Sequence, residues 1–110
     1  MKITETVTYP VSIFIAGDYE AAHQCCQRYC DDIGLCVTIA RTSYVYTEGA
    51  EGGVIIGLIN YPRFPSEPEA IFSRAMDLGH VLRRALLQES FTVQAPDRTV
   101  WVSFREEATA

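Results

Sequence analysis

Residues 54–59 constrain the fold of this chain more than any other segment. Their sequence, VIIGLI, is apolar at every position. A strand with one face in water alternates apolar and polar residues, whereas a strand covered on both faces does not. The segment therefore predicts the centre of a sheet with cover on both sides. The turn YPRFP at residues 61–65 follows it, and its two prolines stiffen the backbone where the chain leaves the sheet.

Strands and helices are predicted on both sides of this segment. β-branched residues and alternation indicate strands at residues 3–16, 35–47 and 54–61 and a strand pair within 91–104. Helical spacing of apolar residues indicates helices at 19–33 and 67–89. Residues 48–53 are expected to form a flexible polar hairpin loop, and residues 105–110 are expected to be frayed.

Local signals predict where the two helices begin and end. Asp18 is the expected N-cap of the first helix, and Gly34 is its expected left-handed terminus. Ser66 and Glu69 have the spacing of a capping box at the start of the second helix. Gly79 lies inside the second helix, where it indicates close packing against a neighbour.

The order of these elements predicts an α+β fold. A β-α-β-β-α-β order with the last strand split into a hairpin is typical of a ferredoxin-like sandwich. We therefore expect a four-stranded antiparallel sheet with two helices on one face, a C-terminal hairpin, and the first and third strands in the centre. At 110 residues, the chain is expected to be a single domain, residues 1–110.

One face of such a sheet has no helices over it. Both alternations of the third strand leave apolar residues there, either Ile55, Gly57, Ile59 and Tyr61 or Val54, Ile56 and Leu58. Large contiguous apolar patches usually mark an interface. We therefore predict a homo-oligomer, most simply a dimer, with Tyr44, Tyr46, Ile55 and Ile59 as candidate interface residues. The alternative is that residues 1–9 or the C-terminal hairpin cover the patch.

Charge and composition exclude several classes of function. Nine basic and fourteen acidic residues give a net charge of −5, which disfavours nucleic acid as a partner. The start, MKITETVTYP, lacks the apolar core of a signal peptide, and no apolar run approaches the ~20 residues that span a bilayer. We expect a cytoplasmic protein with reduced cysteines and no membrane partner.

The sequence contains no motif of an established catalytic, phosphate-binding or dinucleotide-binding site. We therefore expect no catalytic residue and no cofactor. His23, Cys26 and Cys30 share a helical face, with Cys36 further on, but the paired spacing of structural zinc sites is missing. Packing in the core is the expected role, and no metal is expected. A cysteine nucleophile with His23 or His80 as its base is the alternative.

Four residues are candidates for binding a ligand or partner: Asn60, Tyr61, Arg63 and His80. The first three follow the central strand, where a helix N-terminus and an arginine can hold an anion. The alternative is a stiff turn whose aromatic residues cap the core. His80 is expected opposite the main apolar stripe of the second helix. Its role there is that of a solvated surface residue, a partner contact or a pH-sensitive group.

Three segments carry a resemblance to known proteins. IAGD (residues 15–18), GLCVTI (34–39) and GVIIGLINYPRFP (53–65) resemble a family of small uncharacterised bacterial and prophage-type proteins over about residues 10–105. This resemblance implies an accessory or mobile-element protein with a host component as a candidate partner, and it carries over no site residue. Residues 54–87 also resemble tautomerase-type isomerases. That family uses an N-terminal proline, whereas Lys2 stands here and Pro10 is internal.

Two functions are compatible with these observations. The favoured one is a small binding or interaction protein, not an enzyme, that acts as a homo-oligomer through the uncovered sheet face and also contacts a protein partner. The alternative is a small tautomerase-like isomerase with a pocket at the subunit interface, near Tyr61, Arg63 and His80.

Overall fold

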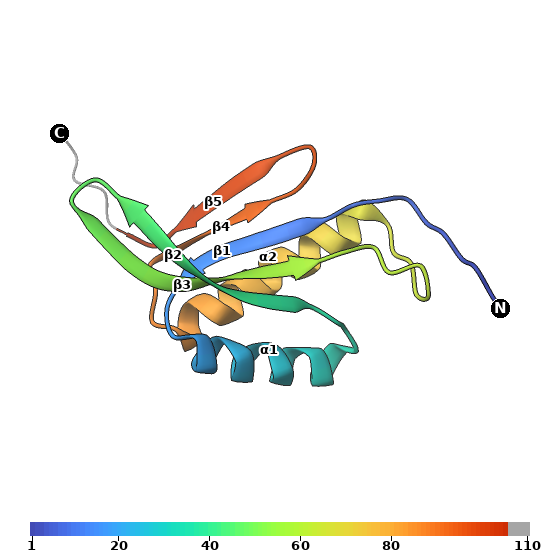
Figure 1. Ribbon diagram of the computed structural model, residues 1–110, viewed down its shortest axis with the longest axis horizontal. Helices are drawn as coiled ribbons and strands as arrows, with labels where there is room; N and C mark the ends of the chain where they lie inside the picture. The colour runs from blue at the N-terminus through green and yellow to red at the C-terminus, as the bar shows by residue number, and fades with distance from the viewer. Residues whose placement is uncertain (106–110) are drawn as a thin grey trace.

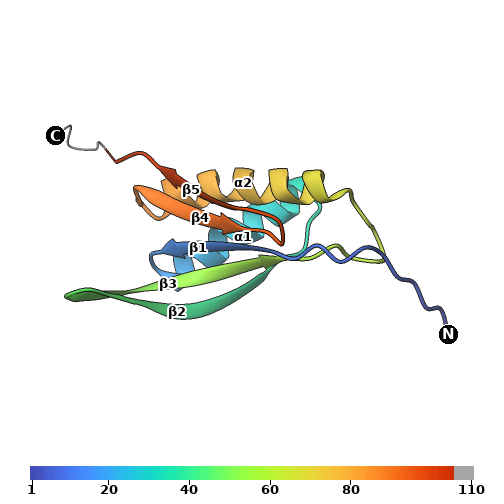
Figure 2. The ribbon, with the colours of Figure 1, turned by 90° about the horizontal axis from the view of Figure 1, so that it is seen from above.

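The computed structural model describes residues 1–105 and has seven elements. In chain order they are β1 (Val11–Ala16), α1 (Tyr19–Ile33), β2 (Thr38–Tyr46), β3 (Gly49–Leu58), α2 (Pro68–Ala85), β4 (Ser90–Gln94) and β5 (Thr99–Ser103). The strands form one antiparallel sheet in the order β2-β3-β1-β4-β5, and both helices pack on one of its faces (Figures 1 and 2). The predicted α+β class is confirmed.

The sheet has five strands, and the prediction of four strands with a separate hairpin is wrong in this respect. β4 pairs with β1 from Ser12↔Gln94 to Phe14↔Thr92, and β5 pairs with β4 along its whole length. The C-terminal hairpin therefore continues the sheet. β1 and β3 both lie inside the sheet, as their apolar residues predicted.

Two predicted strand boundaries are wrong for identifiable reasons. β1 begins at Val11 and not at residue 3, because Pro10 has no N–H to donate and the preceding residues run away from the sheet (Figure 1). The segment 48–53 is not a flexible loop. Thr47 and Glu48 form a tight turn, and β3 begins at Gly49, opposite Tyr46. The β2–β3 hairpin consequently extends beyond β1.

The helix ends follow the predicted signals at α1 but not at α2. The Asp18 side chain accepts a hydrogen bond from Ala21 N at 2.9 Å, and Gly34 ends α1 with φ of 71°, so both predictions are confirmed. At α2 the predicted capping box is wrong. Glu67 is the N-cap without a side-chain cap bond, and the Ser66 hydroxyl instead accepts from Arg74 Nη1. α2 ends at Ala85 rather than at residue 89.

The core lies between the helices and one face of the sheet. Its largest fully buried side chains are Phe91, Ile13, Ile56, Leu58, Leu78, Leu82, Val11, Val54, Val93 and Cys25. The third strand therefore turns Val54, Ile56 and Leu58 toward the helices. Ile55 and Gly57 face the other way, onto the side of the sheet without helices, which we call the open face.

Neither helix within residues 1–105 is long and apolar enough to cross a membrane. The expectation of a frayed tail concerns mostly residues 106–110, which lie outside the described residues.

Close packing at Gly79 predicts a destabilising substitution. A Cβ atom at this position would lie 2.6 Å from Phe91 Cδ2 and nearer still to Cε2, which is a steric overlap with a fully buried ring. Overpacking of this kind costs about 1–3 kcal/mol, and the helix propensity of alanine offsets roughly 1 kcal/mol. We expect Gly79→Ala to lower the free energy of unfolding, measured with urea. Ser73→Ala, at an exposed position of the same helix, is the control, and equal stability of the two variants would contradict this account.

Candidate functional site

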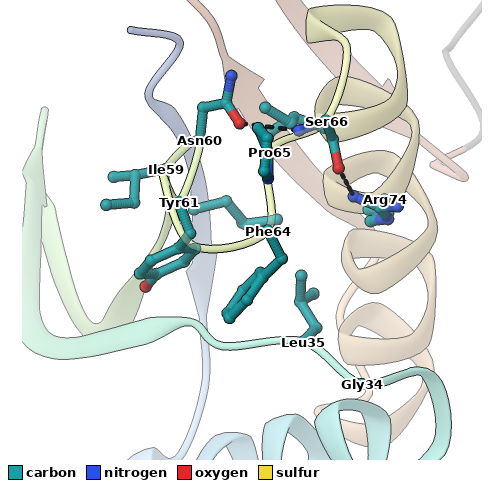
Figure 3. Close-up of a pocket in the computed structure, with 11 residues that line it drawn as sticks. Gly34, Leu35, Ile59, Asn60, Tyr61, Phe64, Pro65, Ser66 and Arg74 are labelled. Atoms are coloured by element: carbon teal, nitrogen blue, oxygen red, sulfur yellow. Dashed lines mark hydrogen bonds between the residues drawn. The ribbon is translucent and has the colours of Figure 1, made fainter. Parts of the chain in front are cut away.

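The structure has a pocket beside the turn that follows β3, which we call the turn pocket (Figure 3). Its volume is about 220 Å³. It is lined by Gly34, Leu35, Leu58, Ile59, Asn60, Tyr61, Phe64, Pro65, Ser66, Ile71 and Arg74. Two of the four predicted binding residues, Asn60 and Tyr61, are therefore brought together here.

Asn60 is buried in the wall of the turn pocket and forms hydrogen bonds to two other segments of the chain. Its side chain is 7% exposed and accepts a hydrogen bond from Ser66 N at 2.9 Å. Its amide group donates to Val7 O at 2.9 Å and approaches Thr6 Oγ1 at 3.4 Å. Because these bonds occupy the amide group and the oxygen, Asn60 fixes the N-terminal segment and the entry to α2.

Tyr61 and Phe64 form the aromatic side of the turn pocket. Their ring centroids are 5.5 Å apart, and Tyr61 Oη donates to Cys36 Sγ at 3.3 Å. This hydrogen bond, together with burial, raises the pKa of Tyr61 to about 12. The phenol therefore stays neutral across the physiological range.

The other two predicted binding residues lie apart from this pair. Arg63 is exposed in the same turn and does not line the pocket. His80 lies on α2, with its ring 5.1 Å from that of Phe91 and 5.9 Å from that of Phe104. The sequence placed His80 opposite the main apolar stripe of α2, whereas in the structure it is half-buried against Phe91 of the core.

A second hollow, which we call the open-face cavity, lies where β1 ends and β4 begins. Its volume is about 450 Å³. It is lined by Phe14, Ile15, Ala16, Tyr44, Glu51, Leu87, Gln88, Glu89, Ser90, Phe91, Thr92 and Arg105. Four strands and the segment before β4 thus contribute side chains from distant parts of the sequence.

Tyr44 and Glu51 form one wall of the open-face cavity. They are directly opposite each other on β2 and β3, so both side chains lie on the open face. Tyr44 Oη donates to Val54 O at 2.6 Å, which lays the ring across β3. Gly53 makes this possible, because a Cβ atom there would lie 2.5 Å from Tyr44 Cε2 and 2.5 Å from Ile15 O. Burial, with a smaller effect of the Glu51 carboxylate, raises the pKa of Tyr44.

Glu89 and Arg105 form the opposite wall. Arg105 Nε donates to Glu89 Oε2 at 2.9 Å, and the two side chains are 61% and 64% exposed. An exposed pair of this kind contributes little to stability and can exchange partners with a ligand. Among residues 1–105 the Glu51 carboxylate makes no ion pair. The open-face cavity therefore combines two carboxylates, one guanidinium and the rings of Phe14 and Tyr44.

The candidate interface residues are distributed over the same face of the sheet. Tyr44 and Ile55 are half-buried there, and Tyr46 is exposed near the hairpin tip. Ile59 follows β3 and is 50% exposed at the rim of the turn pocket. Sequence reasoning missed Glu51, Glu89 and Arg105. Tyr44 and Glu51 are recognised as opposite residues only when the register of the β2–β3 hairpin is known. The sequence predicted a loop at residues 48–53 and therefore gave no register there.

The cysteines are unbridged and differ in exposure. Cys25 and Cys26 are buried, Cys30 is half-buried and Cys36 is exposed. Burial raises the pKa of Cys26 to about 12, which suits a thiol that serves packing. His23 is exposed and does not share the buried face of α1. Within the described part of the chain, no group of three or more His, Cys, Asp or Glu residues could hold a metal ion.

Comparison with known proteins gives two solved structures that share this fold. No family model matches the chain, and no curated protein matches it significantly. A phage SAM lyase in its apo state is 16% identical, with a TM-score of 0.79 over 97% of this chain and 100% of that chain. A phage SAM lyase in complex with S-methyl-5′-thioadenosine is 18% identical, with a TM-score of 0.74 over 94% and 95% of the two chains. At these identities the likeness shows a common fold.

These comparisons correct the predicted function. Both neighbours are enzymes named SAM lyases, an activity outside both functions that the sequence suggested. The prediction of a non-enzymatic interaction protein, with a tautomerase-like isomerase as its alternative, is wrong. Both neighbours are phage proteins, in agreement with the resemblance to small phage-type proteins.

The raised pKa of Tyr61 predicts a pH dependence of stability. The pKa of a tyrosine in an unfolded chain is about 10. Below that pH the phenol is protonated in both states, and its contribution to stability is complete. Between pH 10 and about 12 only the unfolded state loses the proton, so the free energy of unfolding falls as pH rises.

We therefore expect Tyr61→Phe to make the free energy of unfolding fall less steeply than in the wild type over this range. The measurement is urea unfolding at a series of alkaline pH values. Tyr46→Phe, at an exposed position, is the matched control. A slope unchanged by Tyr61→Phe would contradict the assigned hydrogen bond to Cys36.

Proposed function

We propose that this protein is a small enzyme that cleaves S-adenosylmethionine (SAM) and leaves S-methyl-5′-thioadenosine. The observation that carries the proposal is the agreement of the whole chain with a phage SAM lyase, at a TM-score of 0.79 over 97% of one chain and 100% of the other. In this proposal the fold is a ferredoxin-like sandwich that β5 extends. The unbridged cysteines suit a reducing compartment, and we place the protein in the cytoplasm.

The open-face cavity is large enough to be the substrate site, and its charges distinguish it from a hollow of equal volume beside Asp18, Tyr19 and Arg41. Pockets for drug-sized ligands have volumes of about 300–1,000 Å³. The open-face cavity, at about 450 Å³, lies within that range, whereas the turn pocket, at about 220 Å³, does not. A nucleoside with an amino-acid side arm therefore fits the former better.

The charges around the open-face cavity match those of the substrate. SAM carries a sulfonium cation, an ammonium group, a carboxylate and a flat adenine ring. Glu51 and Glu89 can bind the two cations, and Arg105 can bind the carboxylate once it exchanges Glu89 for the ligand. The aromatic faces of Phe14 and Tyr44 suit adenine or the sulfonium. The net charge of −5 also favours the approach of a cationic substrate.

The proposed reaction consumes neither water nor a second substrate. The bond between the sulfonium sulfur and the γ-carbon breaks, and its electron pair goes to sulfur, which becomes a neutral thioether. In the same step the substrate's own carboxylate forms a new bond to the γ-carbon, so the four-carbon fragment leaves as a lactone and no proton is released. The protein acts by holding the side arm in the conformation that this ring closure needs, and such positioning alone removes much of a reaction barrier.

We also propose that the protein is a homo-oligomer that associates through the open face. Ile55 and Trp101 lie on that face without lining the open-face cavity, and Trp101 is 56% exposed. Burial of exposed apolar surface against a second copy would stabilise such an assembly.

SAM turnover tests the proposed activity. We expect the purified protein to convert SAM to S-methyl-5′-thioadenosine, detected by liquid chromatography and mass spectrometry. Glu51→Gln removes one carboxylate at the proposed site and should lower the rate about ten- to a hundredfold, since a hydrogen bond to a charged group contributes about 1.5–3 kcal/mol.

Glu67→Gln makes the same change of net charge at the exposed start of α2 and is the matched control. Absence of S-methyl-5′-thioadenosine with the wild type would rule out the activity. Equal rates for the two variants would move the active site away from the open-face cavity.

The mass of the protein in solution tests the oligomer. Light scattering after size exclusion should give a multiple of the 12.3 kDa chain mass. Ile55→Lys places a charge in the open face and should give a monomer, whereas Ile55→Val should not. A monomeric wild type at micromolar concentration would contradict the proposal, whether or not SAM is cleaved.

A further inference from the structure

We propose that the turn pocket is a second ligand site, separate from the open-face cavity, which binds a small apolar carboxylate through Arg74. This inference does not depend on the proposed cleavage of SAM. It rests on the walls of the pocket, its rigidity and the single guanidinium that lines it.

Apolar and polar groups contribute about equally to the wall of the turn pocket, and the apolar part comes from leucine, isoleucine and aromatic side chains. Leu58 and Ile71 are buried at 2% and 3% exposure, whereas Ile59 and Phe64 are 50% and 52% exposed at its rim. Figure 3 shows Leu35 and the rings of Tyr61 and Phe64 on one side of the hollow, with Arg74 on the other side. A ligand between them would remove this apolar surface from water.

The rim is held in place before any ligand arrives. Phe64 N donates to Tyr61 O at 3.1 Å, and Ser66 N donates to Asn60 Oδ1 at 2.9 Å. Tyr61 Oη donates a hydrogen bond to Cys36 Sγ, and this bond connects the turn to the segment before β2. Because the prolines at residues 62 and 65 restrict the same turn, little conformational entropy is lost when a ligand binds.

Arg74 brings a cation to this pocket. It is half-buried, and its Nη1 donates to Ser66 Oγ at 2.9 Å. No carboxylate within residues 1–105 forms an ion pair with it. Asp77, one helical turn further on, instead accepts a hydrogen bond from Tyr29 Oη at 2.7 Å. A guanidinium has five N–H donors, so Arg74 retains donors for an anion.

The shape and charge together define the ligand class. A planar carboxylate matches the guanidinium with two parallel hydrogen bonds. The volume of about 220 Å³ limits the rest of the ligand to one ring or a short branched chain. Arg74 is the one charged residue among the described residues that line the pocket, so a second charged group on the ligand would have no ionic partner there. A small aryl or branched aliphatic monocarboxylate satisfies these conditions.

Benzoate, its neutral isostere benzamide and S-methyl-5′-thioadenosine are the probes for the test. Each is titrated into the ¹⁵N-labelled full-length protein and followed by NMR. Benzoate should shift the amide signals of Tyr61, Phe64 and Ser66 without shifting those of Phe14 and Tyr44. Benzamide should bind at least about tenfold more weakly than benzoate, because it lacks the charge that Arg74 recognises. Equal affinity for both probes, or no saturable shift with benzoate, would overturn the proposal.

Substitutions at Arg74 show whether the guanidinium is responsible. Arg74→Gln should weaken benzoate about tenfold and leave benzamide unchanged, while Arg74→Lys should retain part of the affinity. Arg84→Gln, at an exposed position of the same helix, is the matched control. Thermal unfolding of each variant shows whether the loss of the Ser66 bond disturbs the fold. If folded Arg74→Gln binds benzoate as the wild type does, the proposal is wrong.

S-methyl-5′-thioadenosine separates this proposal from the proposed enzyme activity. If it displaces benzoate and shifts the amide signals of the turn pocket, the two sites are one and the second site is refuted. If it shifts Phe14 and Tyr44 and leaves benzoate bound, the two sites are independent. Binding of benzoate in a protein that does not cleave SAM would support the turn pocket and refute only the activity.

Discussion

The fold depends on the pairing of β3 with strands on both sides. β3 contacts β2 from Gly49 onward and β1 from Gly53 onward, so its backbone is hydrogen-bonded along both edges. Its residues Val54, Ile56 and Leu58 are buried beneath the helices. A one-residue shift of register would expose these three side chains and turn Ile55 and Gly57 inward. The position of β3 thus determines which face of the sheet receives the helices and which face stays open.

The same strand connects the turn pocket with the open-face cavity. Its beginning carries Glu51 and Gly53, which shape one wall of the open-face cavity. Its end leads into Asn60 and Tyr61, which shape the turn pocket at the opposite end. A cavity of mixed charge and a pocket with one cation therefore share a rigid scaffold. This arrangement allows the two hollows to hold different ligands without a rearrangement of the sheet.

The sequence predicted the class, the helix positions and the central strands because those follow from local patterns. The apolar run at residues 54–59, Asp18 and Gly34 each give their signal within a few residues. The open-face cavity could not be predicted in this way. Glu89 and Arg105 meet through the pairing of β4 with β5, and Tyr44 meets Glu51 through a hairpin register hidden by a glycine-rich segment. The proposed function could not be predicted for the same reason, because no short motif marks a cavity assembled from such distant residues.

The contact between Tyr44 and Gly53 links two positions that are separate in the sequence. The ring of Tyr44 occupies space that a side chain at position 53 would need, and the β1 backbone at Ile15 and Ala16 limits the same space. A larger residue at position 53 would displace the ring, and a smaller residue at position 44 would leave a gap over the strand. Related chains that keep this hairpin and its pairing with β1 should therefore keep glycine at position 53 whatever residue stands at position 44, and an aromatic ring laid over that glycine would help to identify homologues whose identity to this chain is too low to recognise directly.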